Sequence, residues 1–503
     1  MTTSRAGRAE GHMARDFILA IDQGTTGTTV LAVDADLRVR AKHTVEFPQV
    51  FPQPGWVEHE GAAIWRSVEE ATRGCLERGG LSTTDIAAIG ITNQRETTCL
   101  FDRHGQPLSN FIVWQCRRTT QLCQRLKDAG EEPHVRRKTG LVLDPYFSGS
   151  KLSWSFENLG GLREQAAGGD ALFGTIDSWL VHRLTGGRAH VTDVTNASRT
   201  LLMDLETLAW DDGLLELFGV PRACLPRIAS SSEEYGRTSG VRFLPDGIPV
   251  AGIAGDQQAA LFGQACLSAG EAKCTYGTGC FLLLHTGTEI VHSTHGLLTT
   301  VAAQVGGVTH YALEGAAFIA GAAVQWLRDG LKIIERASDI EGLARGVEHS
   351  GDVVFLPALA GLGAPHWRPE ARGLLAGLSR DTDQCHIARA VLEGIALQNR
   401  DILVAMRKDA GHLSVLKVDG GAAANDLLMQ IQSDVLDVPC IRPEVLETTA
   451  LGAAALAGLA IGMFGHPDEL RKVWREDRVF SPRMGEGERA GLLGKWQRAI
   501  ERA

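Results

Sequence analysis

Two short segments rich in glycine and threonine constrain the fold of this chain more than any other feature. The first has the sequence QGTTGTT and lies between the apolar runs Phe17–Ile21 and Val30–Val33. The second, KCTYGTGCFLLL, covers Lys273–Leu284 and has the same design. Two apolar strands joined by a Gly/Thr turn predict a β-hairpin. Because such a hairpin opens each half of the chain, we predict duplicated halves rather than a short-period repeat.

Further strand-then-helix units follow each predicted hairpin. Ile86–Thr92 leads into NQRETT, Ile248–Ala254 leads into GDQQAALFG, and Val415–Val418 leads into DGGAAANDLLMQ. Alternating strands and helices predict an α/β fold with largely parallel sheets. A chain of 503 residues is too long for one ordinary core, so we expect two domains. We place them at residues 16–264 and 265–503.

Composition excludes several functional classes. The hydrophobic share of 44% and the charged share of 22% are typical of a globular, soluble protein. The formal net charge of −10 disfavours a nucleic-acid partner, because phosphate binding needs clustered Lys and Arg. The ten cysteines form no Cys-x-x-Cys pair, which indicates reduced thiols in the cytoplasm and no cysteine metal site.

The chain ends and the apolar stretches give no sign of a membrane segment. The first 15 residues lack the apolar region of a secretory signal, and Met13 is an alternative start. The longest apolar stretch, Ala450–Phe464, is too short to span a bilayer and predicts a buried, closely packed helix. The charged segment after Pro467 is expected at the periphery.

The common nucleotide and hydrolase motifs are absent, so the hairpins become the candidates for phosphate binding. The sequence has no G-x-x-x-x-G-K-[ST] loop, no G-x-S-x-G elbow and no zinc spacing. Asp22 ends the first apolar run, and Thr25 and Thr26 follow in a tight turn. Such a turn offers N–H groups and hydroxyls to phosphate and a carboxylate to Mg²⁺. The alternative is a plain hairpin turn, where Asp and Gly are favoured by geometry alone.

Other candidate residues each have a structural and a functional interpretation. Asp256 begins a helix, so it is either an N-cap or a general base toward an alcohol. Arg95 and Glu96 follow a strand and form either a solvated ion pair or a site for vicinal hydroxyls. Trp114 and Phe281 are core aromatics or apolar walls of such a site.

A glycine pair near the C-terminus is also open to two interpretations. Asp419-Gly420-Gly421-Ala422 joins a predicted strand to a predicted helix. Small residues at this position allow a flat purine ring to approach the backbone. The alternative is tight packing between strand and helix, which uses the same glycines.

Long motifs shared along the chain carry a resemblance to a known family. They span Ile18 to Ala460 and include AIDQGTTG, PGWVEH, IGITNQRETT, IVWQCRRT, TGLVLDPYFSGSK, HVTDVTNASRT, GIAGDQQAALFGQ, YALEGA, PALAGLGAPHW and VDGGAAAND. In this combination and order the chain resembles the FGGY carbohydrate kinase family. NQRETT, VWQCRRT and DPYFSG are more typical of its glycerol-phosphorylating members than of those acting on xylulose or gluconate.

The resemblance implies a fold and an activity. The fold is α/β, with two actin-like (ribonuclease H-like) domains flanking a deep nucleotide and substrate cleft. The activity is ATP-dependent phosphorylation of glycerol to sn-glycerol 3-phosphate, the entry step of glycerol catabolism, with Mg²⁺. It also implies a homo-oligomer, either a dimer or a tetramer.

The same resemblance assigns roles to individual residues. Asp256 would be the general base and Asp22 would serve Mg²⁺. The residues expected to bind glycerol are Arg95, Glu96, Trp114, Tyr146, Asp256, Gln257 and Phe281. Those expected to bind ATP are Thr25, Thr26, Gly27, Thr278, Gly321, Gln325, Gly421 and Asn425.

Departures from the family pattern leave rival interpretations open. Many relatives carry Arg where Thr29 stands, and the segment YGRTSGVRFLPDGIP lacks the glycine run that binds fructose 1,6-bisphosphate in enteric relatives. Ser230–Gly240 contains no histidine that could be the phosphorylated regulatory residue of some Gram-positive relatives.

One rival interpretation of the function is another FGGY sugar or polyol kinase. The other is a non-enzymatic actin-like nucleotide switch, which needs no Arg95, Glu96 and Asp256 together.

Overall fold

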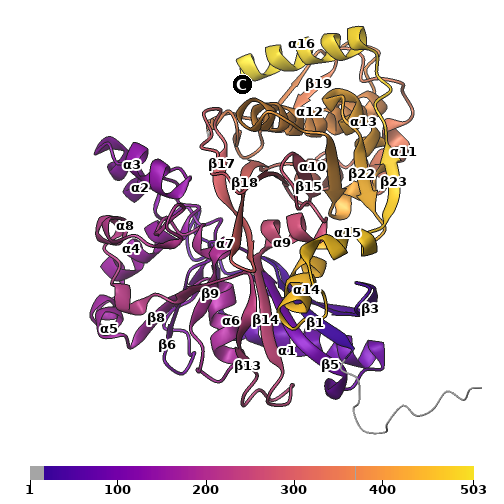
Figure 1. Ribbon diagram of the computed structural model, residues 1–503. Helices are drawn as coiled ribbons and strands as arrows, with labels where there is room; N and C mark the ends of the chain where they lie inside the picture. The colour runs from indigo at the N-terminus through magenta and orange to yellow at the C-terminus, as the bar shows by residue number, and fades with distance from the viewer. Residues whose placement is uncertain (1–15, 369) are drawn as a thin grey trace, which may run out of the picture.

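Two mixed β-sheets form the centres of two domains (Figure 1). The computed structural model describes residues 16–368 and 370–503, so the alternative start at Met13 lies outside the described residues. In Figure 1 the first domain runs from indigo to magenta and the second from orange to yellow. No helix in the described part of the chain is long and apolar enough to cross a membrane.

The first sheet has the order β13-β14-β5-β1-β2-β3. Its strands are β1 (Phe17–Gln23), β2 (Gly27–Val33), β3 (Val39–Glu46), β5 (Ile86–Asn93), β13 (Ser232–Arg237) and β14 (Pro249–Gly255). β1, β2 and β3 pair antiparallel, whereas β5 pairs parallel with β1, and β14 with β5. The first predicted hairpin is therefore confirmed as β1–β2, with Asp22 opposite Thr29.

The second sheet has the order β17-β18-β16-β15-β21-β22-β23. Its strands are β15 (Glu271–Tyr276), β16 (Cys280–Gly287), β17 (Leu298–Val305), β18 (Val308–Ala317), β21 (Val415–Asp419), β22 (Cys440–Pro443) and β23 (Glu476–Phe480). β15, β16 and β18 pair antiparallel, while β21 pairs parallel with β15, and β22 with β21. The run β18-β16-β15-β21-β22 thus repeats the run β3-β2-β1-β5-β14, and the predicted duplication is confirmed.

Helices cover both faces of the first sheet. Leu19 and Ile21 of β1 pack in one cluster with α1 (Gly61–Gly79) and α6 (Ile176–Leu184). Ile18 and Ala20, which alternate with them, pack with Ala454 and other small residues of α14 (Thr448–Ala460). The predicted buried helix is confirmed as α14, which comes from the C-terminal half of the chain and ties it to the first sheet.

The hairpin β17–β18 forms a second connection between the two domains. Its residues Leu298, Val301 and Tyr311 pack in one cluster with Phe147 and Leu205 of the first domain. Figure 1 shows these two strands running between the domains. The hairpin therefore carries side chains of the second domain into the first.

The remaining elements extend the two domains. The helices of the first domain besides α1 and α6 are α2 (Thr120–Asp128), α3 (Glu132–Thr139), α4 (Ser148–Asn158), α5 (Leu162–Gly168), α7 (Val194–Ala197), α8 (Asp212–Phe218) and α9 (Asp256–Gly263). The short strands are β4 (Glu58–His59), β6 (Cys99–Asp102), β7 (Phe111–Ile112), β8 (Ala171–Gly174), β9 (Val191–Asp193), β10 (Met203–Asp204), β11 (Ala209–Trp210), β12 (Arg227–Ala229), β19 (Val354–Leu356) and β20 (Leu374–Ala376).

The second domain ends in elements that the sequence did not predict. Its helices besides α14 are α10 (Gly321–Asp329), α11 (Asp339–Ala344), α12 (Gln384–Ala410), α13 (Asp426–Leu436), α15 (Leu470–Val473) and α16 (Glu486–Arg502).

β23 pairs with β22 at the edge of the sheet, and Trp496 of α16 is buried in the core. The expected peripheral position is confirmed, because β23 is an edge strand and α16 lies on the outside of the domain, held there by a few buried residues such as Trp496.

Candidate active site

The parallel strands of the first sheet bring the predicted polar residues to one edge. In register, Asp22 of β1 lies beside Thr92 of β5, and Gly255 of β14 lies beside Asn93. Arg95 and Glu96 follow β5 directly, and Asp256 follows Gly255 at the start of α9. The strand ends therefore gather Asp22, the Arg95–Glu96 pair and Asp256.

A buried cluster of opposite charges lies at this edge. Arg95 contacts Asp256 with a 3.1 Å distance between Nε and Oδ1. Its Nη1 and Nη2 donate to the two carboxylate oxygens of Glu314, at 2.5 and 3.0 Å. Arg199 donates from Nε to Glu96 at 2.7 Å and from Nη2 to Glu314 at 2.8 Å. Each of these two arginines and two glutamates is at most 1% exposed, whereas the Asp256 side chain is 32% exposed.

The charge on Glu314 is fixed by its arginine partners. Burial alone would raise the pKa of this carboxyl, but the Arg199 and Arg95 guanidiniums outweigh burial and lower the pKa to about 2. A buried charge needs such pairing, since an unpaired one costs several kcal/mol, on the order of 3–5. Glu314 is therefore ionised at neutral pH, and Asp256 has the most exposed side chain of the cluster.

Aromatic side chains stand next to the cluster. Trp114 packs edge-on against Tyr146, with ring centroids 5.5 Å apart, and against Phe281, at 6.4 Å. The Tyr146 hydroxyl accepts a hydrogen bond from Arg95 Nη2 at 3.3 Å. Phe281 lies on β16 of the second domain, so this group brings both domains to the predicted substrate site.

Gln257 is held from the second domain by a buried lysine. Lys273 Nζ donates to the Gln257 side-chain oxygen, to Thr275 Oγ1 at 2.9 Å and to the Phe281 carbonyl at 3.2 Å. Burial lowers the pKa of Lys273. Lys273 therefore connects the predicted substrate residue Gln257 with the strand that carries Phe281.

Asp22 has the environment of a cation ligand. Burial, and then the negative charge of Asp256, raise the pKa of Asp22 to about 7, while Lys42 opposes the shift. A cation between these carboxylates would relieve their repulsion. Within residues 16–368 and 370–503, no group of three or more His, Cys, Asp or Glu forms a metal site. One carboxylate fits Mg²⁺ that is held mainly by phosphate oxygens.

The first Gly/Thr turn lies against Trp114. The turn is closed by a hydrogen bond from Gly24 N to Gly27 O at 2.9 Å. Thr25 Oγ1 accepts a hydrogen bond from Trp114 Nε1 at 2.9 Å, and Thr26 is exposed. The turn that is predicted to bind phosphate and the aromatic wall that is predicted to bind substrate are therefore in direct contact.

The second Gly/Thr turn meets two other predicted nucleotide segments. Gly321 N at the start of α10 donates to Gly277 O at 3.0 Å, and Ala320 N donates to Thr278 O at 2.8 Å. Gly420 has a φ of 84°, and a Cβ there would lie 2.6 Å from the Tyr276 carbonyl. Only glycine fits this approach, so the Gly420–Gly421 turn packs directly on the end of β15.

The predicted ATP residues of these segments differ in exposure. Thr278, Gln325 and Gly421 are exposed, and Gly321 is half-buried. Asn425 caps α13, because its Oδ1 accepts from Leu428 N at 2.9 Å.

Family models match most of the chain. The model described as the N-terminal domain of the FGGY family of carbohydrate kinases matches residues 17–263, and the model of its C-terminal domain matches residues 272–461. The chain belongs to the FGGY family of carbohydrate kinases. The predicted family and kinase class are therefore confirmed.

Full-length similarities extend this result. A Myxococcus xanthus protein named glycerol kinase is 62% identical over 491 residues, which cover 97% of this chain and 99% of that protein. The crystal structure of Plasmodium falciparum glycerol kinase with ADP matches with a TM-score of 0.90 at 37% identity, covering 97% and 98% of the two chains. Gluconate kinase from Lactobacillus acidophilus, 24% identical with a TM-score of 0.86 over 96% and 97%, shares the fold. The predicted two-domain, actin-like α/β fold is confirmed.

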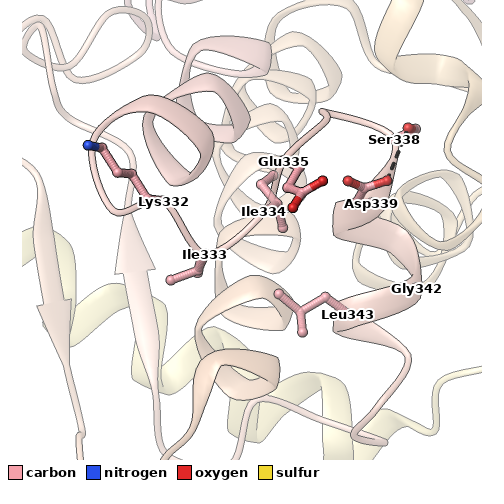
Figure 2. Close-up of a pocket in the computed structure, with 8 residues that line it drawn as sticks. All are labelled: Lys332, Ile333, Ile334, Glu335, Ser338, Asp339, Gly342 and Leu343. Carbon is pink, nitrogen blue, oxygen red and sulfur yellow. Dashed lines mark hydrogen bonds between the residues drawn. The ribbon is translucent and has the colours of Figure 1, made fainter.

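A hollow in the second domain of this FGGY kinase is separate from the charge cluster. It has a volume of about 720 Å³ and lies between the end of α10 and α11 (Figure 2). It is lined by Lys332, Ile333, Ile334, Glu335, Ser338, Asp339, Gly342 and Leu343. None of these is a predicted site residue.

Three residues of the charged network were missed by sequence reasoning. They are Glu314, Arg199 and Lys273. Glu314 lies in the apolar strand YALEGA and Lys273 in the apolar start of KCTYGTGCFLLL. A lone charge in a strand that is otherwise apolar is a signal of a buried ionic partner. Arg199 had no such local signal, because its neighbours in TNASRT are largely polar.

Proposed function

We propose that this FGGY kinase transfers the γ-phosphoryl group of ATP to glycerol and forms sn-glycerol 3-phosphate. The observation that carries the proposal is the Arg95–Asp256 pair beside Trp114, Tyr146 and Phe281. A short polyol presents hydroxyls to a charged pair and carbon atoms to aromatic faces. The long, full-length similarity to proteins named glycerol kinase supports this substrate over other FGGY substrates.

Asp256 acts as the general base in this proposal. Its carboxylate is partly exposed and is oriented by Arg95 Nε at 3.1 Å. It takes the proton of the attacking hydroxyl as the oxygen bonds to the γ-phosphorus, and the oxygen that bridges to ADP leaves with the electron pair. Arg95, Glu96, Tyr146 and Gln257 bind the other hydroxyls, and Trp114 and Phe281 pack against the carbon chain.

Both Gly/Thr turns hold the nucleotide in this proposal. Thr25, Thr26 and Gly27 bind phosphate from the first domain, and Thr278 binds it from the second. Gly321, Gln325, Gly421 and Asn425 bind the adenosine part. Asp22 would hold Mg²⁺, which when bound would supply positive charge next to the phosphates. The contact of Trp114 with Thr25 supports the arrangement, because it brings the phosphate turn beside the substrate.

Three further assignments complete the proposal. We place the domain boundary between residues 264 and 265, within the segment 264–271 that separates the two matched family models. The enzyme works in the cytoplasm, which fits its free cysteines. By resemblance to the family it forms a homo-oligomer, either a dimer or a tetramer.

A coupled assay of ADP formation over a panel of polyols and sugars tests the function. Glycerol is expected to exceed xylulose and gluconate in kcat/KM by roughly several tens-fold, because a misfit leaves buried polar groups unpaired. Equal efficiency with a pentulose would favour another FGGY kinase. ADP release that no polyol or sugar stimulates would favour a nucleotide switch.

A further inference from the structure

The strongest unassigned feature is the way Glu314 holds Arg95. The two terminal nitrogens of Arg95 fork onto both oxygens of the Glu314 carboxylate, at 2.5 and 3.0 Å. Such a fork fixes the plane of the guanidinium as well as its position. The third nitrogen, Nε, lies 3.1 Å from Asp256 Oδ1 and 3.7 Å from Glu96 Oε1. Glu314 thus determines which edge of Arg95 faces the base.

Arg199 fixes the side chain of Glu96, as Glu314 fixes that of Arg95. Glu96 has a φ of 60°, in the left-handed region that costs a non-glycine residue on the order of 1–3 kcal/mol. Arg199 Nε holds its carboxylate at 2.7 Å, and Ser148 Oγ donates to its carbonyl at 3.0 Å. Arg199 also reaches Glu314 at 2.8 Å, and Arg95 Nε lies 3.7 Å from Glu96 Oε1, so the four charged side chains form one connected ring.

A buried ring of four charges contributes little to the free energy of folding. Removing each of the four charges from water costs on the order of several kcal/mol. Apolar residues of similar volume at these positions would often stabilise the fold as well or better. Arg199 Nη1 is buried without a hydrogen-bond partner among the described residues. The two arginines and two glutamates cancel in charge, which leaves Asp256 with the net negative charge of the group. This arrangement suits a site that must hold a base and orient hydroxyl-binding groups.

We propose that Glu314 and Arg199 are positioning residues for polyol binding. They hold Arg95 and Glu96 in the orientation that the substrate hydroxyls require, without touching the substrate themselves. The inference rests on the proposed function, because it takes Arg95 and Glu96 as the hydroxyl-binding pair. Glu314 lies on β18 of the second domain, so the polyol site of the first domain is complete only when the β17–β18 hairpin is in place.

The test is Glu314→Gln, which keeps the shape of the side chain and removes its charge. We expect KM for glycerol to rise at least about tenfold, because Arg95 loses its fixed plane. KM for ATP is expected to stay within about twofold, since among the described residues no predicted ATP residue forms a hydrogen bond or ion pair with the ring. A structural defect alone would lower the amount of active enzyme without separating the two KM values.

Glu393→Gln is the matched control. Glu393 is also buried in the second domain, where it pairs with Arg389 at 2.8 Å and accepts from Ser350 at 2.6 Å. Its variant should lose thermal stability and leave KM for glycerol unchanged. If Glu314→Gln does not fold, Arg199→Lys replaces it, because lysine keeps the charge and cannot bridge Glu96 and Glu314 with two nitrogens.

The outcomes separate this inference from the proposed function. A wild-type enzyme that phosphorylates glycerol, together with an unchanged KM for glycerol in Glu314→Gln or in its substitute Arg199→Lys, overturns the positioning role alone. Equal increases in KM for glycerol in Glu314→Gln and Glu393→Gln would do the same. A wild-type enzyme that does not phosphorylate glycerol overturns the proposed function itself.

Discussion

Of the two interpretations of Asp256, the N-cap is wrong. The N-cap of α9 is Gly255, without a side-chain cap, and Asp256 is the first residue of the helix, where its Oδ1 accepts from the adjacent Gln257 N at 2.7 Å. The same oxygen lies 3.1 Å from Arg95 Nε, in a side chain that remains partly exposed. The Asp256 side chain therefore does not cap the helix, and its contact with Arg95 fixes the orientation of the carboxylate.

Replacing Asp256 with Asn should separate turnover from binding. The amide keeps the shape of the side chain but does not take a proton from the hydroxyl. We expect kcat to fall at least about a hundredfold, the low end of general-base contributions, with a smaller change in KM for glycerol. Steady-state kinetics with glycerol varied measures both. Asp212→Asn, at a carboxylate that is 88% exposed, is the control, and near-normal turnover in Asp256→Asn would remove it from the base role.

Thr29 occupies the place of an arginine in many relatives, and its surroundings indicate a minor role. Its Oγ1 shares a hydrogen bond of 2.9 Å with Thr44 Oγ1 across β2 and β3. Thr29→Ala should cost under about 1.5 kcal/mol, the upper end for a neutral hydrogen bond. This corresponds to roughly tenfold or less in efficiency for ATP. Kinetics with ATP varied at saturating glycerol gives the value, and a hundredfold loss would show that Thr29 makes a necessary phosphate or metal contact.

The sequence predicted residues whose chemistry depends on a local motif and missed those that depend on a distant partner. Asp22, Arg95 and Asp256 directly follow or end predicted strands, so the topology alone gathers them. Glu314 reaches Arg95 from 219 positions away in the chain. No local pattern encodes that pairing, because it arises only when β18 packs on the first domain.

At the scale of elements, the short hairpins and the buried helix could be predicted, and the C-terminal edge could not. A Gly/Thr turn between apolar runs determines β1–β2 and β15–β16 locally. β23 and α16 contain many charges, and their burial depends on a few residues such as Trp496. The positions of such elements depend on the apolar surface that they cover, which the sequence of the element itself does not show.

Helix α14 offers a direct test of close packing between elements. A Cβ added at Gly452 would lie 1.9 Å from the Ala259 carbonyl oxygen of α9. Because this oxygen belongs to the backbone, one of the two helices would have to shift. Gly452→Ala should therefore destabilise the protein by about 1–3 kcal/mol, as overpacking does. Gly491→Ala in α16, where a Cβ meets nothing within 4 Å, should be neutral or stabilising by up to about 1 kcal/mol.

Thermal unfolding of both variants measures the difference. A lower Tm for Gly452→Ala and an unchanged or higher Tm for Gly491→Ala are expected. Equal Tm values for the two variants would contradict the account of α14 as a helix that is closely packed against α9.

At the scale of the whole molecule, the duplicated sheets place one Gly/Thr turn in each domain. The first turn contacts Trp114 through Thr25, and Trp114 packs against Phe281 beyond the second turn. The family and the two-domain fold followed from motifs in order along the chain. The predicted site residues remain predictions until they are changed one at a time.

The central claim is that the protein phosphorylates glycerol. The most direct measurement incubates it with ATP, Mg²⁺ and glycerol, and quantifies ADP together with the phosphorylated product by phosphorus NMR. The account predicts one sn-glycerol 3-phosphate for each ADP formed. ADP that appears without a phosphorylated polyol would contradict it.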